Sequence, residues 1–126
     1  RSFDVLVVDD SEIAREVVRE VLLQRGYVVR EAINGKEALR EIEQRRPRLV
    51  VTDLEMPVMD GFELLRSLRA AKATRELPVI VLTSRGAEAD IRRAMNIGAD
   101  GYLVKARMEN EELLATIERF LTVDVL

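Results

Sequence analysis

Leu49-Val50-Val51-Thr52-Asp53 is a short apolar run that ends in a carboxylate, and it indicates the fold of the chain. Four more β-branched runs occur along the sequence, and stretches of helical periodicity separate them. Strands that alternate with helices predict a doubly wound α/β domain with a parallel sheet. The near-continuous apolar character of the first, third and fourth runs predicts central strands covered on both faces. The predicted strands span residues 4–9, 27–32, 48–53, 78–83 and 101–105.

Turn and capping residues predict where the helices begin and end. A first helix over about 12–25 ends before Gly26. Asn34 with Glu37, and Asp60 with Glu63, have the spacing of a capping box and predict the starts of the second and third helices.

Apolar stripes predict which helix faces pack against the sheet. The fourth helix, around 87–97, has a weak stripe of mostly small residues and is predicted to be loosely held. The stripe residues are Ile13, Val17 and Val21 with Ala14, Val18 and Leu22 in the first helix, Ala87, Ile91, Ala94 and Met95 in the fourth, and Leu113, Leu114, Ile117, Phe120 and Leu121 in the last.

Composition excludes several classes of protein. The 126 residues are 48% hydrophobic and 34% charged, which is typical of one globular domain. A net charge of −3 without a basic stripe predicts no direct nucleic-acid binding, and the short apolar runs predict no membrane span. The absence of cysteine favours a cytoplasmic location, and the absence of histidine means that the chain cannot supply a phosphohistidine. Because it begins at Arg1 without methionine, we expect a piece of a longer protein.

Polar side chains collect where the predicted strands end. Asp9 and Asp10 follow the first strand and Asp53 ends the third, whereas Thr83 and Lys105 end the fourth and fifth. The carboxyl ends of parallel strands form one crevice, so these residues are predicted to converge. Three carboxylates, a hydroxyl and an ammonium together predict a divalent-metal site that handles phosphate.

With these residues in place, the chain resembles the receiver domain of two-component response regulators, the CheY-like family, over essentially residues 1–126. The resemblance implies a five-stranded parallel sheet of order 2-1-3-4-5 flanked by five helices, the flavodoxin-like architecture. The segments that carry it are Val7-Val8-Asp9-Asp10-Ser11, Thr52-Asp53-Leu54-Glu55-Met56-Pro57-Val58-Met59-Asp60-Gly61, Leu82-Thr83-Ser84 and Gly98-Ala99-Asp100-Gly101-Tyr102-Leu103-Val104-Lys105.

The resemblance implies that Asp53 is the phosphoacceptor, which attacks a phosphohistidine on a partner kinase in a magnesium-dependent reaction. Asp10 and Asp53 would hold Mg²⁺, or Mn²⁺ in its place, directly. Asp9 would act through water, and the backbone carbonyl of Glu55 would add an oxygen. These hard oxygen ligands suit Mg²⁺, and phosphoryl transfer asks mainly for positioning and charge neutralisation. Such a domain catalyses its own phosphorylation and dephosphorylation.

The resemblance also implies a phosphate-dependent switch. Lys105 and Thr83 would each contact a phosphoryl oxygen, and the small Ser84 would leave room for the phosphate. Tyr102 occupies the position of the family's switch aromatic and would then turn inward. The readout surface would consist of the fourth helix, the fifth strand and the fifth helix.

Two departures from the family pattern lead to specific expectations. Ala106 stands where most receivers have a cis proline, so we predict a trans Lys105-Ala106 bond and a re-routed loop, since a cis non-proline bond costs about 3 kcal/mol. Glu55 and Arg85 each lie two residues beyond a site residue. We predict that they pair across the mouth of the site and alter the lifetime of the phosphoryl group.

The sequence after Lys105 resembles that of receivers fused to chemotaxis-type histidine kinases. This resemblance implies that the partner is a kinase or phosphotransfer domain. In a hybrid kinase of a phosphorelay, that partner would lie in the same polypeptide. A flavodoxin-like FMN carrier is disfavoured because Asp9-Asp10-Ser11-Glu12 would repel an anion. An aspartate-based phosphohydrolase is also disfavoured, because it would show two aspartates separated by one residue after its first strand, whereas Asp9 and Asp10 are adjacent. The serious alternative is a receiver fold that acts as a phosphorylation-independent interaction module, and metal binding would discriminate it.

Overall fold

A parallel sheet of five strands in the order β2-β1-β3-β4-β5 forms the centre of the computed structural model, which describes residues 4–121. This order confirms the expected topology, and each strand lies within one residue of its predicted bounds at either end. The ends of the predicted 1–126 domain lie outside the described residues. The strands are β1 (Asp4–Val8), β2 (Val28–Ala32), β3 (Leu49–Thr52), β4 (Val79–Thr83) and β5 (Gly101–Val104).

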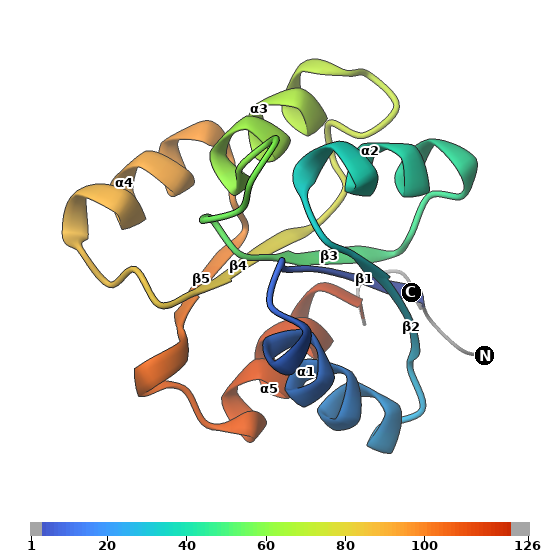
Figure 1. Ribbon diagram of the computed structural model, residues 1–126, viewed down its shortest axis with the longest axis vertical. Helices are drawn as coiled ribbons and strands as arrows, with labels where there is room; N and C mark the ends of the chain where they lie inside the picture. Colours follow the sequence, from blue (N-terminus) through green and yellow to red (C-terminus); the bar gives the residue numbers. More distant parts are fainter. Residues whose placement is uncertain (1–3, 122–126) are drawn as a thin grey trace.

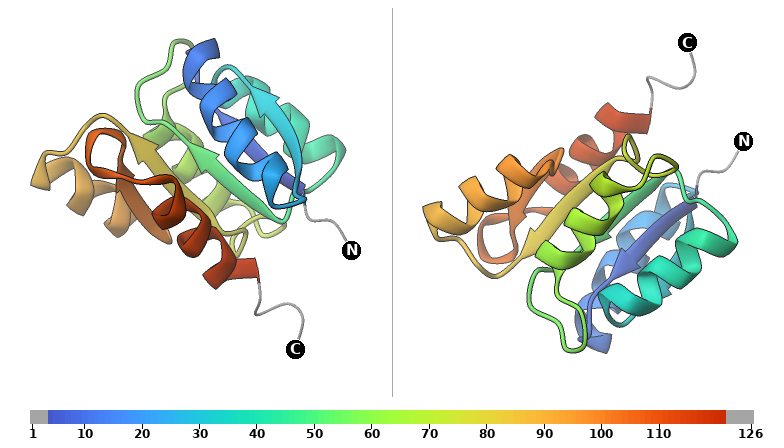
Figure 2. Two further views of the ribbon diagram at one scale, coloured as in Figure 1. Left: turned by 90° about the horizontal axis from the view of Figure 1, so that it is seen from below. Right: turned by 90° about the horizontal axis from the view of Figure 1, so that it is seen from above.

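Helices cover both faces of the sheet, as Figure 1 shows, with α2, α3 and α4 above it and α1 and α5 below. Figure 2 shows α1 beside α5 from below and α2 beside α3 from above. No helix within residues 4–121 is long and apolar enough to cross a membrane. The helices are α1 (Glu12–Gln24), α2 (Gly35–Gln44), α3 (Gly61–Ala70), α4 (Glu88–Ile97) and α5 (Asn110–Leu121), and a short 3₁₀ turn, Lys105–Arg107, precedes α5.

The core consists of two apolar layers that the sheet separates. Successive strand residues point to opposite faces, so in β1 Val5 and Val7 pack toward α1 and α5, whereas Leu6 and Val8 pack toward α2, α3 and α4. All four side chains are buried, which is why the central strands have near-continuous apolar sequences.

The predicted helix ends are largely confirmed. Gly26 follows α1 with a positive φ of 82°, which an L side chain rarely adopts. Asp60 and Glu63 form the complete capping box at α3. At α2 only half of the predicted box forms: Asn34 Oδ1 accepts from Glu37 N at 2.8 Å, but the Glu37 carboxylate accepts from Ile33 N instead of the cap residue.

The predicted packing faces of α1 and α4 need correction. Ile13 and Val17 are 77% and 53% exposed, because the offset stripe that contains Val18 and Leu22 faces the sheet. In α4 only Ala94 is fully buried, and Ala87 and Met95, which we expected to face inward, are exposed. The expectation that α4 buries little area is therefore confirmed.

The loop between β3 and α3 is tightly built. Gly61 packs so closely on the preceding strand that a Cβ there would lie 2.8 Å from Leu54 Cα and even closer to the carbonyl oxygen of Asp53. Met59 N donates to the carbonyl of Pro57 at 2.8 Å around Val58, which has a positive φ of 71°. A β-branched residue in this conformation stores strain, and such strain is typical of functional loops.

Arg69 of α3 lies at the amino ends of β4 and β5, at the edge of the sheet opposite Asp53. Its guanidinium donates to the carbonyls of Gly98 at 2.9 Å and Leu77 at 2.8 Å and pairs with Asp100 at 3.0 Å. Asp100 in turn accepts from Val79 N at 2.8 Å. One arginine therefore joins α3 to the segments that enter β4 and β5.

Candidate functional site

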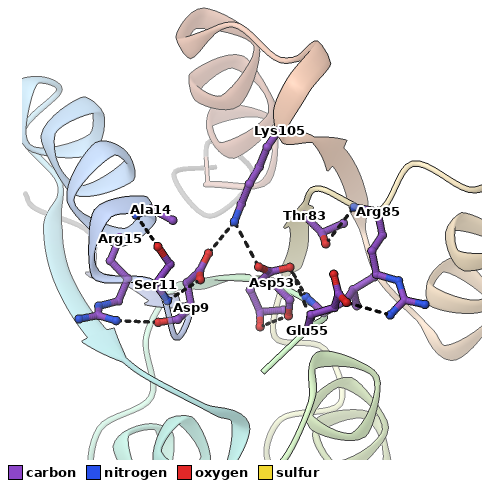
Figure 3. Close-up of polar contacts among 11 residues, drawn as sticks. Asp9, Ser11, Ala14, Arg15, Asp53, Glu55, Thr83, Arg85 and Lys105 are labelled. Carbon is purple, nitrogen blue, oxygen red and sulfur yellow. Dashed lines mark hydrogen bonds and ion pairs between the residues drawn. The ribbon is translucent and has the colours of Figure 1, made fainter. Parts of the chain in front are cut away.

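Lys105 bridges two carboxylates at the carboxyl edge of the sheet. Its Nζ lies 2.8 Å from Asp9 Oδ2 and 3.2 Å from Asp53 Oδ2, as Figure 3 shows. The three residues follow β1, β3 and β5, so strands far apart in sequence bring them together as predicted. The Asp9 and Asp53 side chains are only 8% and 10% exposed, and the ammonium is therefore their common counterion.

Backbone groups orient both carboxylates. Asp53 Oδ1 accepts from Leu54 N at 2.6 Å, and Asp9 Oδ1 accepts from Ser11 N at 2.9 Å, so each side chain turns its other oxygen toward Lys105. Arg15 of α1 donates to the Asp9 carbonyl at 2.7 Å and is itself paired with Glu31 of β2. Arg15 was not predicted as a site residue, because it has no motif signal and is identified only by this contact.

The environment of Lys105 keeps its side chain charged. Burial acts to lower the pKa of Lys105, but the hydrogen bond to Asp9 and the charges of Asp53 and Asp9 act in the opposite direction, and the net result is a raised pKa. Lys105 is therefore a cation across the neutral range.

The chemistry of the oxygen donors suits magnesium. Mg²⁺ in proteins is held by one or two carboxylates and keeps several waters, and Asp9 with Asp53 supplies such a pair. Asp10 is exposed, and within residues 4–121 no three carboxylates converge closely enough to hold a metal ion, so the predicted cluster of three carboxylates does not form here. Asp10 would have to turn inward to bind a metal ion. Lys105 would then share its two partners, Asp9 and Asp53, with that ion.

Thr83 and Tyr102 are both bonded to the backbone of Arg85 in the loop after β4. Thr83 is fully buried, and its Oγ1 accepts from Arg85 N at 3.3 Å. The Tyr102 hydroxyl donates to the Arg85 carbonyl at 2.6 Å, and burial, followed by the charge of Asp90, raises the pKa of Tyr102. Ser84, between Thr83 and Arg85, is exposed and makes no side-chain hydrogen bond in the described part of the chain. The hydrogen bond from Tyr102 therefore joins the loop after β4 to β5.

Glu55 and Arg85 pair as predicted, with 3.7 Å between Arg85 Nη1 and Glu55 Oε2. Figure 3 shows the pair beside Asp53, on the side of Thr83. Arg85 makes a closer contact that the sequence analysis missed: Asp90, in the first turn of α4, lies 3.1 Å from its Nε. An acidic residue five positions after the arginine, near a helix start, is the signal that could have identified it.

The peptide bond after Lys105 has the predicted conformation. No peptide bond within residues 4–121 is cis, so the Lys105-Ala106 bond is trans as predicted. The chain forms the 3₁₀ turn and carries Arg107 across to the loop after β4, where a Cβ on Gly86 would lie 2.8 Å from Arg107 Nη2.

Comparisons with known proteins agree with this geometry. The model of the response regulator receiver domain family matches residues 5–118. A gliding motility regulatory protein of Myxococcus xanthus is 41% identical over 91% of the chain, which spans only 15% of that relative's length. The chemotaxis response regulator CheY4 of Vibrio cholerae is 35% identical, with a TM-score of 0.87 over 96% of this chain and 100% of that one.

A second similar structure contains a metal. The receiver domain of a sensor histidine kinase from Pseudomonas aeruginosa, 28% identical with a TM-score of 0.87 over 95% of this chain and 98% of that one, has a magnesium ion coordinated in its active-site cleft. The carboxylate pair, the bridging lysine, the strand order and the matching family model lead to one assignment: the chain belongs to the response regulator receiver domain family of two-component systems.

Proposed function

We propose that this domain accepts a phosphoryl group on Asp53 from a phosphohistidine of a histidine kinase or phosphotransfer domain. The observation that carries the proposal is the position of Asp53, which is nearly buried at the end of a central strand, 3.2 Å from Lys105. A carboxylate in this setting is already a nucleophile, and an ammonium beside it can neutralise the added charge.

In the proposed reaction an Asp53 carboxylate oxygen attacks phosphorus, and the bond between phosphorus and the histidine nitrogen breaks. The imidazole leaves with the electron pair of that bond, and Asp53 becomes an acyl phosphate. Lys105 then pairs with a phosphoryl oxygen while it retains Asp9, 2.8 Å away. The same site would later direct water to phosphorus and return Asp53 to its free form.

Mg²⁺, with Mn²⁺ as a substitute, would neutralise charge on the phosphoryl oxygens when bound. Asp9, Asp10, Asp53 and the backbone carbonyl of Glu55 are the residues that would hold it. Within the chain, the hydrogen bonds of Asp9 Oδ1 to Ser11 N and of Asp53 Oδ1 to Leu54 N fix two of these carboxylates beforehand.

Thr83 and Tyr102 would couple the phosphoryl group to a surface. The Thr83 hydroxyl would donate a hydrogen bond to a phosphoryl oxygen, and the small Ser84 would leave room for the phosphate. The loop that contains Arg85 would move together with Thr83. Because the Arg85 carbonyl holds the Tyr102 hydroxyl, a shift of this loop would change the preferred position of Tyr102. The affected surface is formed by α4, β5 and α5.

The test is incubation with Mg²⁺ and acetyl phosphate followed by intact mass measurement. The parent domain is expected to gain one phosphoryl group, and Asp53→Asn is expected to gain none because an amide cannot attack phosphorus. Asp10→Asn provides a control that keeps the nucleophile and weakens only metal binding, so it should be phosphorylated more slowly. A parent that gains no mass while folded would reject the proposal.

We further propose that Glu55 and Arg85 slow the loss of the phosphoryl group, because an ion pair at the mouth of the site would partly obstruct the hydrolytic water. Replacing both with alanine should speed dephosphorylation about threefold, the size expected when an exposed ion pair is removed. The decay of the phosphorylated mass after removal of the donor is the measurement. The exposed pair Arg92 and Glu88 on α4, 3.1 Å apart, gives a matched double-alanine control. Equal decay in the parent and the Glu55/Arg85 variant would contradict this role.

A second candidate function is a phosphorylation-independent interaction module that regulates a linked kinase. One observation favours it: Lys105 pairs with both Asp9 and Asp53, so a cation of the chain itself balances one of their two negative charges. A magnesium titration followed by tyrosine fluorescence separates the candidates, because the module needs no metal and the phosphoacceptor does. The chain has two tyrosines and no tryptophan, so Tyr27→Phe makes Tyr102 the sole reporter.

The partner is proposed to be a histidine kinase or phosphotransfer domain, located in the same polypeptide if the protein is a hybrid kinase of the chemotaxis type. Such a reaction takes place in the cytoplasm, where the phosphohistidine is formed. We propose no direct contact with nucleic acid or membrane for this domain.

A further inference from the structure

One guanidinium on the loop after β4 is shared between two carboxylates from different elements. Arg85 Nε and Nη2 lie 3.1 Å and 3.3 Å from the two oxygens of Asp90, and both contacts are hydrogen bonds. Glu55 Oε2 lies 3.7 Å from Arg85 Nη1, which is an ion pair but too long for a hydrogen bond. The Asp90 side chain is 18% exposed and that of Glu55 60%.

The pair with Asp90 is the stronger of the two. Bidentate arginine-carboxylate contacts fix geometry as well as charge, whereas a long pair with an exposed carboxylate is weakened by water. The hydrogen bond to Asp90 is also the leading cause of the raised pKa of Arg85. The guanidinium is therefore held toward α4, with a weaker second partner at the mouth of the site.

The backbone of Arg85 is held separately from its side chain. Its carbonyl accepts from the Tyr102 hydroxyl and its N–H donates to Thr83 Oγ1. If Asp90 lost its charge, the guanidinium could turn about this fixed backbone toward Glu55. Glu55 N lies 3.5 Å from Asp53 Oδ1, so the backbone of Glu55 lies directly beside the phosphoacceptor.

We infer that Asp90 is a positioning residue that holds the Arg85 guanidinium on the α4 side of the site and so sets the lifetime of the phosphoryl group. This inference rests on the proposed phosphoacceptor function. Hydrolysis forms a bond from a water oxygen to phosphorus and breaks the bond from phosphorus to the Asp53 oxygen, which leaves as carboxylate. A guanidinium released from Asp90 pairs more fully with Glu55 and the phosphoryl charge, and it covers the path of that water.

The test is the decay rate of the phosphorylated domain in Asp90→Asn, measured by intact mass after the donor is removed. The decay should slow about threefold, as expected for the gain of one ion pair of ordinary strength at the mouth. The double variant with Arg85→Ala should decay at the rate of Arg85→Ala alone, because Asp90 acts only through Arg85. A purely structural effect of Asp90 would persist in the double variant.

Two further variants control for charge and for helix stability. Glu88→Gln removes the same charge from the same turn of α4, but Glu88 pairs with Arg92 and not with Arg85, so its decay should match the parent. Asp90→Glu retains a carboxylate that can reach Arg85 and should restore the decay to within about twofold of the parent.

The outcomes separate this inference from the function on which it rests. A parent domain that accepts no phosphoryl group would overturn the proposed function and the role of Asp90 with it. A parent that is phosphorylated but decays at the same rate as Asp90→Asn would overturn only the role of Asp90. Slowing in both Asp90→Asn and Glu88→Gln would also overturn it, because the effect would then come from helix charge.

Discussion

Replacing Lys105 with methionine should lower the free energy of unfolding by about 2 kcal/mol in the absence of magnesium. The substitution leaves Asp9 and Asp53 close together, each nearly buried, without the cation that both contact at 2.8 and 3.2 Å. Loss of one partner of a fully buried pair costs about 3–5 kcal/mol, and water at the mouth reduces this cost. The Lys105 side chain is 29% exposed, which places the site between a buried and a surface pair.

Urea unfolding followed by circular dichroism measures this loss. Removing one of the two anions should recover part of it, so Lys105→Met with Asp53→Asn should be more stable than Lys105→Met alone. Magnesium should stabilise Lys105→Met more than the parent, because a metal ion replaces the missing charge. Lys72→Met makes the same change at an exposed position and should alter stability by less than about 0.5 kcal/mol. An equal loss in both lysine variants would rule out a special role for Lys105.

The contribution of Lys105 should persist across neutral pH. Its pKa is raised in the folded state, so the folded protein holds this proton more tightly than the unfolded chain does. The stabilisation is therefore complete below the ordinary lysine value of about 10.4 and is lost only as the pH rises through the raised value.

Gly61→Ala should cost about 3 kcal/mol of stability, the upper range for overpacking. The new Cβ would meet Leu54 Cα at 2.8 Å and the carbonyl carbon of Asp53 at 3.0 Å, and it would press on the Asp53 oxygen as well. These are backbone atoms, which cannot rotate away as a side chain can. The segment that presents the Asp53 carboxylate would have to shift, so phosphorylation by acetyl phosphate should slow in the same variant.

Gly86→Ala is the matched control for this prediction. The atoms nearest to a Cβ there belong to the guanidinium of Arg107, the flexible end of a side chain, and the first lies at 2.8 Å. Its stability should stay within about 0.5 kcal/mol of the parent. If thermal or urea unfolding showed Gly61→Ala to be as stable as Gly86→Ala, the close approach at Asp53 would not be a constraint.

The sheet and the converging site residues were predictable because both depend on strong local signals. Four of the five apolar runs end in a polar residue, so the convergence of Asp53, Asp9 and Lys105 follows from parallel pairing. The strand order came from a family resemblance, since periodicity does not determine which strands are neighbours. The exposed face of α1 was mispredicted because Ile13 and Val17 form a second stripe that local spacing cannot distinguish from the buried one.

Contacts that depend on how the elements and loops pack were not predicted from the sequence. Arg69 binds Asp100 and carbonyls from two other segments, yet nothing in its neighbours indicates a partner 31 residues away. Arg15 reaches the carbonyl of Asp9 only because α1 lies over β1 and β2. Asp90 is close to Arg85 in sequence, but their pairing depends on the path of the loop between β4 and α4.

The sparse burial of α4 has a consequence for the order in which the native state opens. Ala94 is its only fully buried residue, and Ala87, the N-cap residue before the helix, makes no side-chain capping bond. Amide protons in α4 should exchange with solvent through local openings that require less free energy than global unfolding, whereas those of β1 and β3 exchange last. The element proposed to transmit the signal therefore costs less free energy to rearrange than the central strands, and the strands that hold Asp9 and Asp53 remain in place.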